Sequence, residues 1–295
     1  MNIKVSGFKI QLKTRNYFDS DIFEIDDDSY GETDHMIFES LESFAVPDCH
    51  ACIYEDDVSL ITIYKESAKF YLAIKDVLLA QIYIVGKIVR VWLNRNISDA
   101  ALQEITIKKI FPIFCYNTYA ALPLHATGVF KDRLLLSFTG YSTSGKSTLA
   151  ASFIYDGLFN LISDDIMFLF YENNKIFIYP TKSELKLRDD VRPHFLNKLS
   201  TTKSSIITSK GKIQISSIIL LDQEFSESIN LQRLTSNKHK IILQSLYAGG
   251  LCNYSSDFLK YMFNMTNVLD IWRLSYPRNL SILENVKEKL ISTFS

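Results

Sequence analysis

Residues 134–154 have the sequence LLLSFTGYSTSGKSTLAASFI. The apolar run at 134–139 predicts a buried strand, and the segment from Ser147 to Tyr155 predicts a helix. Between them, Gly140 to Ser147 fits the pattern G-x-x-x-x-G-K-[ST], which forms a phosphate-binding loop (P-loop) where a strand leads in and a helix leads out. Because both flanks are present, the stretch predicts an α/β fold that binds a nucleotide. The alternative is a turn that contains glycines and a coincidental lysine.

The loop pattern assigns a task to each of its main residues. Gly140 and Gly145 permit backbone conformations that other residues resist, so successive N–H groups can turn inward at a helix N-terminus and bind phosphate oxygens. Lys146 is expected to reach the β- and γ-phosphates of ATP, and the Ser147 hydroxyl is expected to ligate Mg²⁺. The other loop residues expected around the phosphates are Ser142, Thr143, Ser144 and Thr148.

Two adjacent carboxylates, Asp164 and Asp165, follow the loop by one short helix and one turn. They lie within an apolar run, Leu161 to Phe170, that predicts a strand. In a P-loop fold, an acidic residue at this place can hold Mg²⁺ directly or through water. Two carboxylates allow a second task, which is to accept a proton from an attacking hydroxyl. The alternative is a pair of turn or helix-capping residues.

One histidine, His125, lies at the start of the expected strand Leu124–Val129, which precedes the expected strand Arg133–Thr139. A single histidine is more often structural than catalytic. Its residue type alone therefore gives little reason to place it in a site.

Three segments together resemble a known family: LHATGVF at 124–130, TGYSTSGKSTLA at 139–150 and DGLFNLISDDIMFL at 156–169. They are similar to HPr serine kinase/phosphorylase and its relatives. The resemblance implies the P-loop kinase domain of the HPr-kinase C-terminal type, a sheet with a P-loop and flanking helices. It also implies that Asp164 is the general base toward a substrate serine, that Asp165 is the metal partner, and that His125 lies near the transferred phosphoryl group. Which aspartate has which role stays open.

The chain also departs from that family. The family's later signature, a segment rich in Glu-x-Arg-Gly, has no clean match, and the nearest residues are Glu184, Lys186 and Arg188. If this segment is a strand, the three side chains share one face, and one or both cations could bind phosphates. The alternative is a solvated strand face. Without the signature, phosphorolysis of a phosphoserine is not implied.

The size of the chain and the order of its segments are most similar to the short lasso-peptide kinase group within that family. This resemblance implies phosphorylation of a serine, typically the C-terminal one, on a ribosomally made precursor peptide or small protein. The family's regulators are hexamers, so a homo-oligomer is left open. The identity of the acceptor does not follow from the residues.

The rest of the sequence indicates two domains, residues 1–98 and 99–295. The first is β-rich and small, with strands expected at Asn2–Lys13, Val58–Tyr64, Lys69–Ile74 and Gln81–Leu93. Ser98 can cap a helix that runs from Asp99 toward Ala121 and that Pro112 should kink or split. The further strands expected are Lys175–Tyr179, Lys212–Leu221 and Ile271–Tyr276, and the further helices are Leu243–Leu251, Asp257–Asn267 and Leu280–Phe294.

Composition excludes several classes of partner. The 295 residues include 32 Lys and Arg against 33 Asp and Glu, so the net charge of −1 gives no global field for nucleic acid or an anionic membrane. The apolar runs fall short of the ~18 residues of a membrane span, and the N-terminus has no signal-peptide pattern. Four Cys are too few for a disulfide framework. We therefore expect a cytoplasmic protein without nucleic-acid or membrane partners.

A zinc site at Cys49-His50-Ala51-Cys52 is disfavoured, because a closed zinc site needs four ligands and the sequence has no second Cys pair. The sequence instead predicts an ATP- and Mg²⁺-dependent serine kinase. Three alternatives stay open. The chain could be an ATPase or nucleotide-dependent switch with no phosphoacceptor, a kinase of a small metabolite, or a binding module whose loop only stabilises the fold.

Overall fold

The computed structural model describes residues 2–5, 8–13, 24–25, 34–40, 52–56, 61–66, 69–74, 78–84, 88–93, 97–180, 185–196, 212–222, 226–247 and 256–295. The chain divides into two compact units. The first consists of Met1–Leu122 and Tyr247–Phe258, and the second of Pro123–Leu246 and Leu259–Ser295. The helical segment after residue 98, which the sequence analysis assigned to the second domain, belongs to the first unit.

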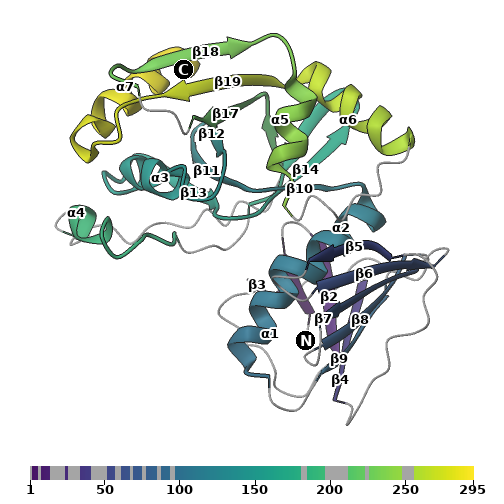
Figure 1. The fold of residues 1–295 in the computed structure, drawn as a ribbon. Helices are drawn as coiled ribbons and strands as arrows, with labels where there is room; N and C mark the ends of the chain where they lie inside the picture. The colour runs from purple at the N-terminus through teal and green to yellow at the C-terminus, as the bar shows by residue number, and fades with distance from the viewer. Residues whose placement is uncertain are drawn as a thin grey trace. The chain divides into compact units, whose positions relative to one another are not determined.

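The first unit contains a nine-stranded sheet in the order β3-β1-β2-β4-β9-β8-β7-β6-β5 (Figure 1). Strand β4 pairs in parallel with β2 and β9, and the other pairs are antiparallel. The expected strand Gln81–Leu93 is two strands, β8 and β9. The bounds are β1 Asn2–Val5, β2 Phe8–Lys13, β3 Glu24–Ile25, β4 Asp34–Ser40, β5 Cys52–Asp56, β6 Ile61–Glu66, β7 Lys69–Ile74, β8 Leu78–Tyr83 and β9 Ile88–Leu93.

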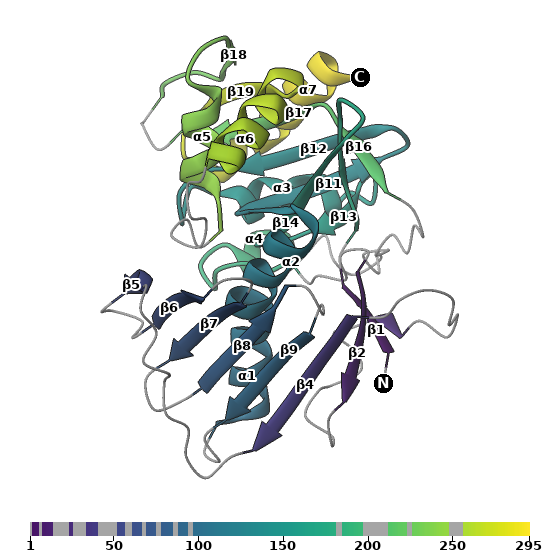
Figure 2. The same ribbon diagram turned by 90° about the vertical axis from the view of Figure 1, so that its right-hand side faces the viewer.

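A helical segment crosses one face of this sheet (Figures 1 and 2). It consists of α1 (Asp99–Ile105), a π-helical turn η1 (Thr106–Ile110) and α2 (Phe111–Tyr119). The expected cap is confirmed, because the Ser98 hydroxyl accepts the Ala101 N–H at 3.3 Å. Pro112 falls in the first turn of α2, directly after the π turn. A widened turn accommodates a proline ring that would otherwise clash with the carbonyl four residues earlier.

The second unit is built on a six-stranded sheet in the order β13-β11-β12-β17-β19-β18. Strand β12 pairs with β11 as the expected hairpin and with β17 in parallel, and β17 also pairs in parallel with β19. One hydrophobic core cluster joins β12, helix α3 and helix α7. Its buried side chains include Phe138 of β12, Leu149 and Phe153 of α3, and Leu290 of α7. The bounds are β11 Ala126–Lys131, β12 Leu134–Thr139, α3 Lys146–Ile154, β13 Asn160–Ser163, β17 Ser217–Leu221, β18 Asn230–Leu234, β19 Asp270–Ser275 and α7 Leu283–Phe294.

A second sheet of the same unit has the order β10-β14-β15-β16. Two expected strands are wrong in the same way: the run 161–170 is divided between β13 and β14, and the run 212–221 between β16 and β17, each pair in different sheets. Strand β18 and helix α4 were not expected, and α5 begins five residues before its expected start. The bounds are β10 Leu122–Leu124, β14 Met167–Glu172, β15 Lys175–Ile178, α4 Arg192–Leu196, β16 Ile213–Ile215, α5 Lys238–Ser245, α6 Ser256–Val268 and η3 Leu280–Ile282.

Among the described residues, no helix has both the length and the apolar character that crossing a membrane requires.

Candidate functional site

The segment 140–145, here called the glycine loop, connects β12 to α3. Gly145 caps the helix in the left-handed region with φ 93°, and Gly140 has φ 145°. A Cβ on Gly140 would lie 2.9 Å from the Leu221 carbonyl oxygen at the end of β17 and 2.8 Å from the Ser144 hydroxyl. Both glycines are therefore required by the backbone, as the loop pattern predicts.

Lys146 is the first residue of α3 and is 6% exposed. Its Nζ donates to the carbonyl oxygens of Gly140 and Tyr141, each at 3.0 Å. Burial lowers the pKa of the ammonium to about 8, although the nearby carboxylates of Asp165 and Asp164 act in the opposite direction. The ammonium thus lies on carbonyl oxygens of the loop itself. It does so at the N-terminus of a helix, where the helix dipole favours anions.

Asp164 is held by three donors from three different segments. Its Oδ1 accepts the Thr127 hydroxyl of β11 at 2.7 Å and the Ser147 hydroxyl of α3 at 3.1 Å, and its Oδ2 accepts the backbone N–H of Lys186 at 3.0 Å. The carboxylate that contacts the expected Mg²⁺ ligand Ser147 is therefore Asp164. Its position next to the helix N-terminus follows from the pairing of β11 with both β12 and β13.

Asp165 has a φ of 74° and lies in the turn between β13 and β14. Like Asp164, it lies near enough to Lys146 to act on the charge of its ammonium. One of its oxygens lies 3.9 Å from Nε2 of His125, and 31% of the Asp165 side chain is exposed. The histidine is fixed by its backbone, because its N–H donates to Ser245 at 2.7 Å and its carbonyl accepts the Thr139 hydroxyl at 3.0 Å. His125 and Asp165 thus form a pair that solvent can reach beside the glycine loop.

The remaining predicted residues are placed less uniformly. Ser142 and Thr143 are exposed, Ser144 is buried and Thr148 is partly buried in the first turn of α3. Residues 185–188 form no strand, so the expectation of a shared strand face is wrong for the described part of that segment.

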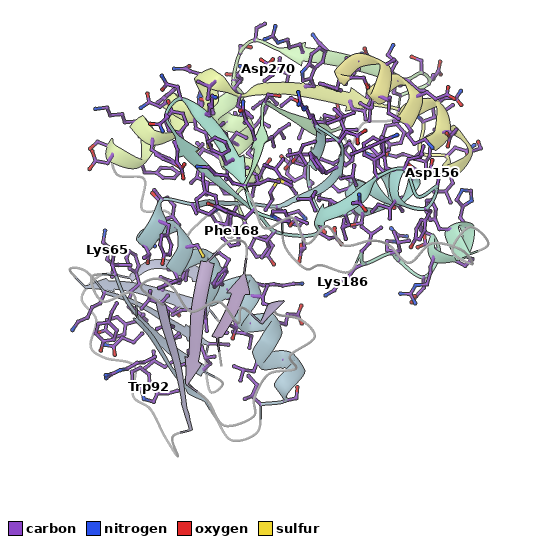
Figure 3. All side chains as sticks on the ribbon, turned by 180° about the vertical axis from the view of Figure 1, so that it is seen from behind. Lys65, Trp92, Asp156, Phe168, Lys186 and Asp270 are labelled. Atoms are coloured by element: carbon purple, nitrogen blue, oxygen red, sulfur yellow. The ribbon has the colours of Figure 1, made fainter. Side chains whose placement is uncertain are left out.

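Within that segment, the backbone N–H of Lys186 donates to Asp164, and the exposed Lys186 side chain projects from the surface of its unit (Figure 3). Arg188 is exposed and pairs with Asp190 at 2.5 Å. Glu184, Cys49 and His50 lie outside the described residues, as does the side chain of Cys52.

The sequence motifs did not indicate three residues that lie near the glycine loop. Thr127 lies within the quoted segment LHATGVF, and its place on a strand beside the loop strand was a usable signal. Asp222 follows the apolar run Ile218 to Leu221, and an aspartate after such a run was another. Arg278 donates to the carbonyl oxygens of Ser144 and Asp222. No local pattern could have found this contact, because arginine and loop are 134 residues apart.

The residues fit a nucleotide and Mg²⁺. The Ser144 hydroxyl is buried at 2% exposure and, among the described residues, has no hydrogen-bond partner. The described residues contain no group of three metal-ligating side chains. Mg²⁺ usually binds through one or two carboxylates plus substrate phosphates, and Ser147 and Asp164 present a hydroxyl and a carboxylate side by side at the start of α3.

Comparisons with known proteins find similar solved structures. No family model matches the chain, and no curated protein matches it. Among solved structures, the HPr(Ser) kinase/phosphatase from Coxiella burnetii is similar at 15% identity and a TM-score of 0.29, over 58% of this chain and 91% of that one. At this identity and TM-score we infer neither fold nor activity from the likeness.

Proposed function

We propose that the chain is an ATP- and Mg²⁺-dependent phosphotransferase that moves the γ-phosphoryl group to a serine hydroxyl of a peptide or small protein. The observation that carries the proposal is a hydrogen-bonded group in which the hydroxyls of Ser147 and Thr127 both donate to Asp164. This group lies at the start of α3, next to the glycine loop, and Lys146, the first residue of that helix, is buried. A helix N-terminus, a lysine and a carboxylate paired with a hydroxyl are the parts that bind a triphosphate with its cation.

The nucleotide would occupy the cradle at the start of α3. The loop N–H groups would bind phosphate oxygens, and Lys146 would exchange the carbonyls of Gly140 and Tyr141 for the β- and γ-phosphates. Ser147 and Asp164 would hold Mg²⁺, which when bound neutralises phosphate charge. Thr127 would keep the Asp164 carboxylate directed at Ser147.

The geometry favours the opposite division between the two aspartates from the one that the family resemblance implies. Asp164 already accepts three hydrogen bonds, one of them from the expected Mg²⁺ ligand Ser147, so its carboxylate is engaged at the metal side of the site. Asp165 is partly exposed and lies beside His125, where an acceptor could approach. We therefore assign Asp164 to the metal and Asp165 to the proton. The serine Oγ would bond to the γ-phosphorus, the bond to the β-phosphate oxygen would break, and the hydroxyl proton would pass to Asp165.

The acceptor class is supported by the family resemblance alone. The size of the chain and the order of its segments are similar to those of the lasso-peptide kinases, which favours the C-terminal serine of a ribosomally made precursor peptide. Positioning and charge neutralisation would supply most of the rate, because phosphoryl transfer needs little covalent chemistry from the protein.

The test measures phosphoryl transfer directly. The full chain is incubated with radiolabelled ATP, Mg²⁺ and a peptide that ends in serine, and label on the peptide is compared with free phosphate. The same peptide with a C-terminal alanine is the acceptor control. Asp165→Asn should lower transfer by a factor on the order of 10² or more, and Asp189→Asn, an exposed aspartate of the same unit, should not change it.

Two results would contradict the proposal. Phosphate release without labelled peptide would make the chain an ATPase or switch. Full transfer activity of Asp165→Asn would remove the assignment of the base.

A further inference from the structure

Arg278 is a second cation at the glycine loop, and none of the sequence motifs includes it. It follows β19 by three residues. Its Nη1 donates to the carbonyl oxygen of Ser144 in the loop, and its Nη2 donates to the carbonyl oxygen of Asp222 at the end of β17. One planar guanidinium therefore joins the loop to the neighbouring parallel strand. A lysine, with a single ammonium, does not present such a fork.

The guanidinium is held in place from the β19 side. It lies over the ring of Tyr276 at 5.3 Å from the centroid, and Tyr276 is buried. The second acceptor is fixed as well, because the Asp222 N–H donates to the carbonyl of Leu274 at 2.9 Å. The arginine and one of its two partners are thus anchored to the sheet, and the loop carbonyl is the remaining partner.

Holding the Ser144 carbonyl fixes the direction of the next N–H. A trans peptide is planar, and its C=O and N–H point in opposite directions. Since the carbonyl of the 144–145 peptide points to Arg278, the N–H of Gly145 points away from it. Gly145 is the N-cap residue of α3, where N–H groups face a bound anion.

The same residue is in close contact with the arginine. A Cβ added to Gly145 would lie 3.0 Å from Nη1 of Arg278 and 3.5 Å from the hydroxyl of Tyr276. Arg278 and Tyr276 therefore pack closely against the Cα of Gly145, and a side chain at this position would push against the arginine.

We propose that Arg278 is a positioning residue of the nucleotide site: it orients the 144–145 peptide so that the Gly145 N–H faces the phosphates. This inference rests on the proposed function, because it needs a phosphate in the loop. It adds a residue from beyond β19 to a site whose predicted residues lie between His125 and Arg188.

The test compares three variants of the full chain. Arg278→Ala removes the fork, Arg278→Lys keeps the charge without the fork, and Arg233→Ala removes an arginine of β18 that pairs with Asp270 and is the matched control. Calorimetric titration with ATP and with inorganic pyrophosphate, both with Mg²⁺, gives the affinity. Thermal unfolding of the unliganded protein separates loss of fold from loss of affinity.

We expect Arg278→Ala to weaken both ligands at least tenfold, Arg278→Lys to fall between it and the wild type, and Arg233→Ala to stay within about twofold. Guanidinium ion at millimolar concentration should restore part of the affinity of Arg278→Ala. The amide resonance of Gly145 should shift in that variant without ligand and return with guanidinium, which a role only in folding stability would not produce.

Three outcomes would overturn the proposal, and they can be told apart. If the wild type binds ATP and Arg278→Ala binds it equally well, or if the Gly145 resonance does not move, the positioning role fails and the proposed function stands. If the wild type binds neither ATP nor pyrophosphate, both fail. Should Arg278→Ala not fold, Arg278→Lys with wild-type affinity and an unmoved Gly145 resonance also overturns it.

Discussion

Binding of ATP should be coupled to proton uptake by Lys146. In the unliganded protein, burial lowers the pKa of this ammonium to about 8. Phosphate oxygens placed beside Nζ favour the charged form and raise the pKa again. A group that is partly neutral before binding and charged afterwards must take a proton from the buffer.

The size of the effect follows from the pKa. With a value of about 8, Lys146 is about half charged near pH 8, about one quarter charged near pH 8.5 and about nine-tenths charged near pH 7. Binding should then take up roughly 0.5, 0.75 and 0.1 proton per ATP at these three pH values. The uptake should rise with pH, which is opposite to the trend expected for a group that releases protons.

Calorimetry measures this uptake directly. ATP is titrated into the protein with Mg²⁺ in buffers of different ionisation enthalpy, and the slope of the observed enthalpy gives the number of protons. Lys146→Arg is the matched control, because a guanidinium stays charged throughout and should show no uptake. The reasoning is refuted if the wild type shows no uptake near pH 8.5, if Lys146→Arg shows the same uptake, or if the carbon resonance next to Nζ titrates near the ordinary pKa of about 10.4.

Three further changes have defined outcomes. Thr127→Val removes the 2.7 Å hydrogen bond to Asp164 and should lower the free energy of unfolding by about 1–3 kcal/mol in urea denaturation; an unchanged midpoint would show that this bond adds no stability. Gly145→Ala and Gly157→Ala, both at positive φ, should each lower the free energy of unfolding by about 1–2 kcal/mol. Only the Gly145 variant should also lose ATP affinity by calorimetry, and equal losses would contradict a phosphate-facing loop. Between about pH 8 and 10.5, the unfolded chain binds more protons at Lys146 than the native chain does, so stability relative to Lys146→Met should rise with pH; a fall across this range would contradict the lowered pKa.

Local pattern was sufficient for the elements that flank the glycine loop. The hairpin β11–β12 and helix α3 were predicted within one or two residues, because apolar strands, two glycines and a helix start lie next to each other in sequence. The strand ends at Thr139 and the helix begins at Lys146, and the spacing of the apolar residues changes accordingly. The cap at Ser98 was predictable for the same reason.

Long-range pairing limited the rest. The run from Leu161 to Phe170 is apolar on both sides of Asp164, and strands buried on both faces show no alternation that would mark a break. The turn at Asp165 has a positive φ, and an aspartate by itself does not predict a turn at this position. The chain therefore looked like one strand although it passes into a second sheet.

The site shows the same limit. His125, Lys146 and the two aspartates lie in segments with recognisable spacing, and the structure brings them together. Lys186 contributes a backbone N–H, which any residue except proline could supply, so its side chain gave no signal. Arg278 reaches the loop only because β19 pairs with β17 beside β12.

The central claim is that the glycine loop and Asp164 together bind ATP with Mg²⁺. Titration of the full chain with ATP, in the presence and in the absence of Mg²⁺, tests it most directly. We expect one site that Mg²⁺ strengthens, that Lys146→Met abolishes and that Asp164→Asn makes insensitive to Mg²⁺. Absence of binding by the wild type, or an equal response of Asp164→Asn to Mg²⁺, would contradict it.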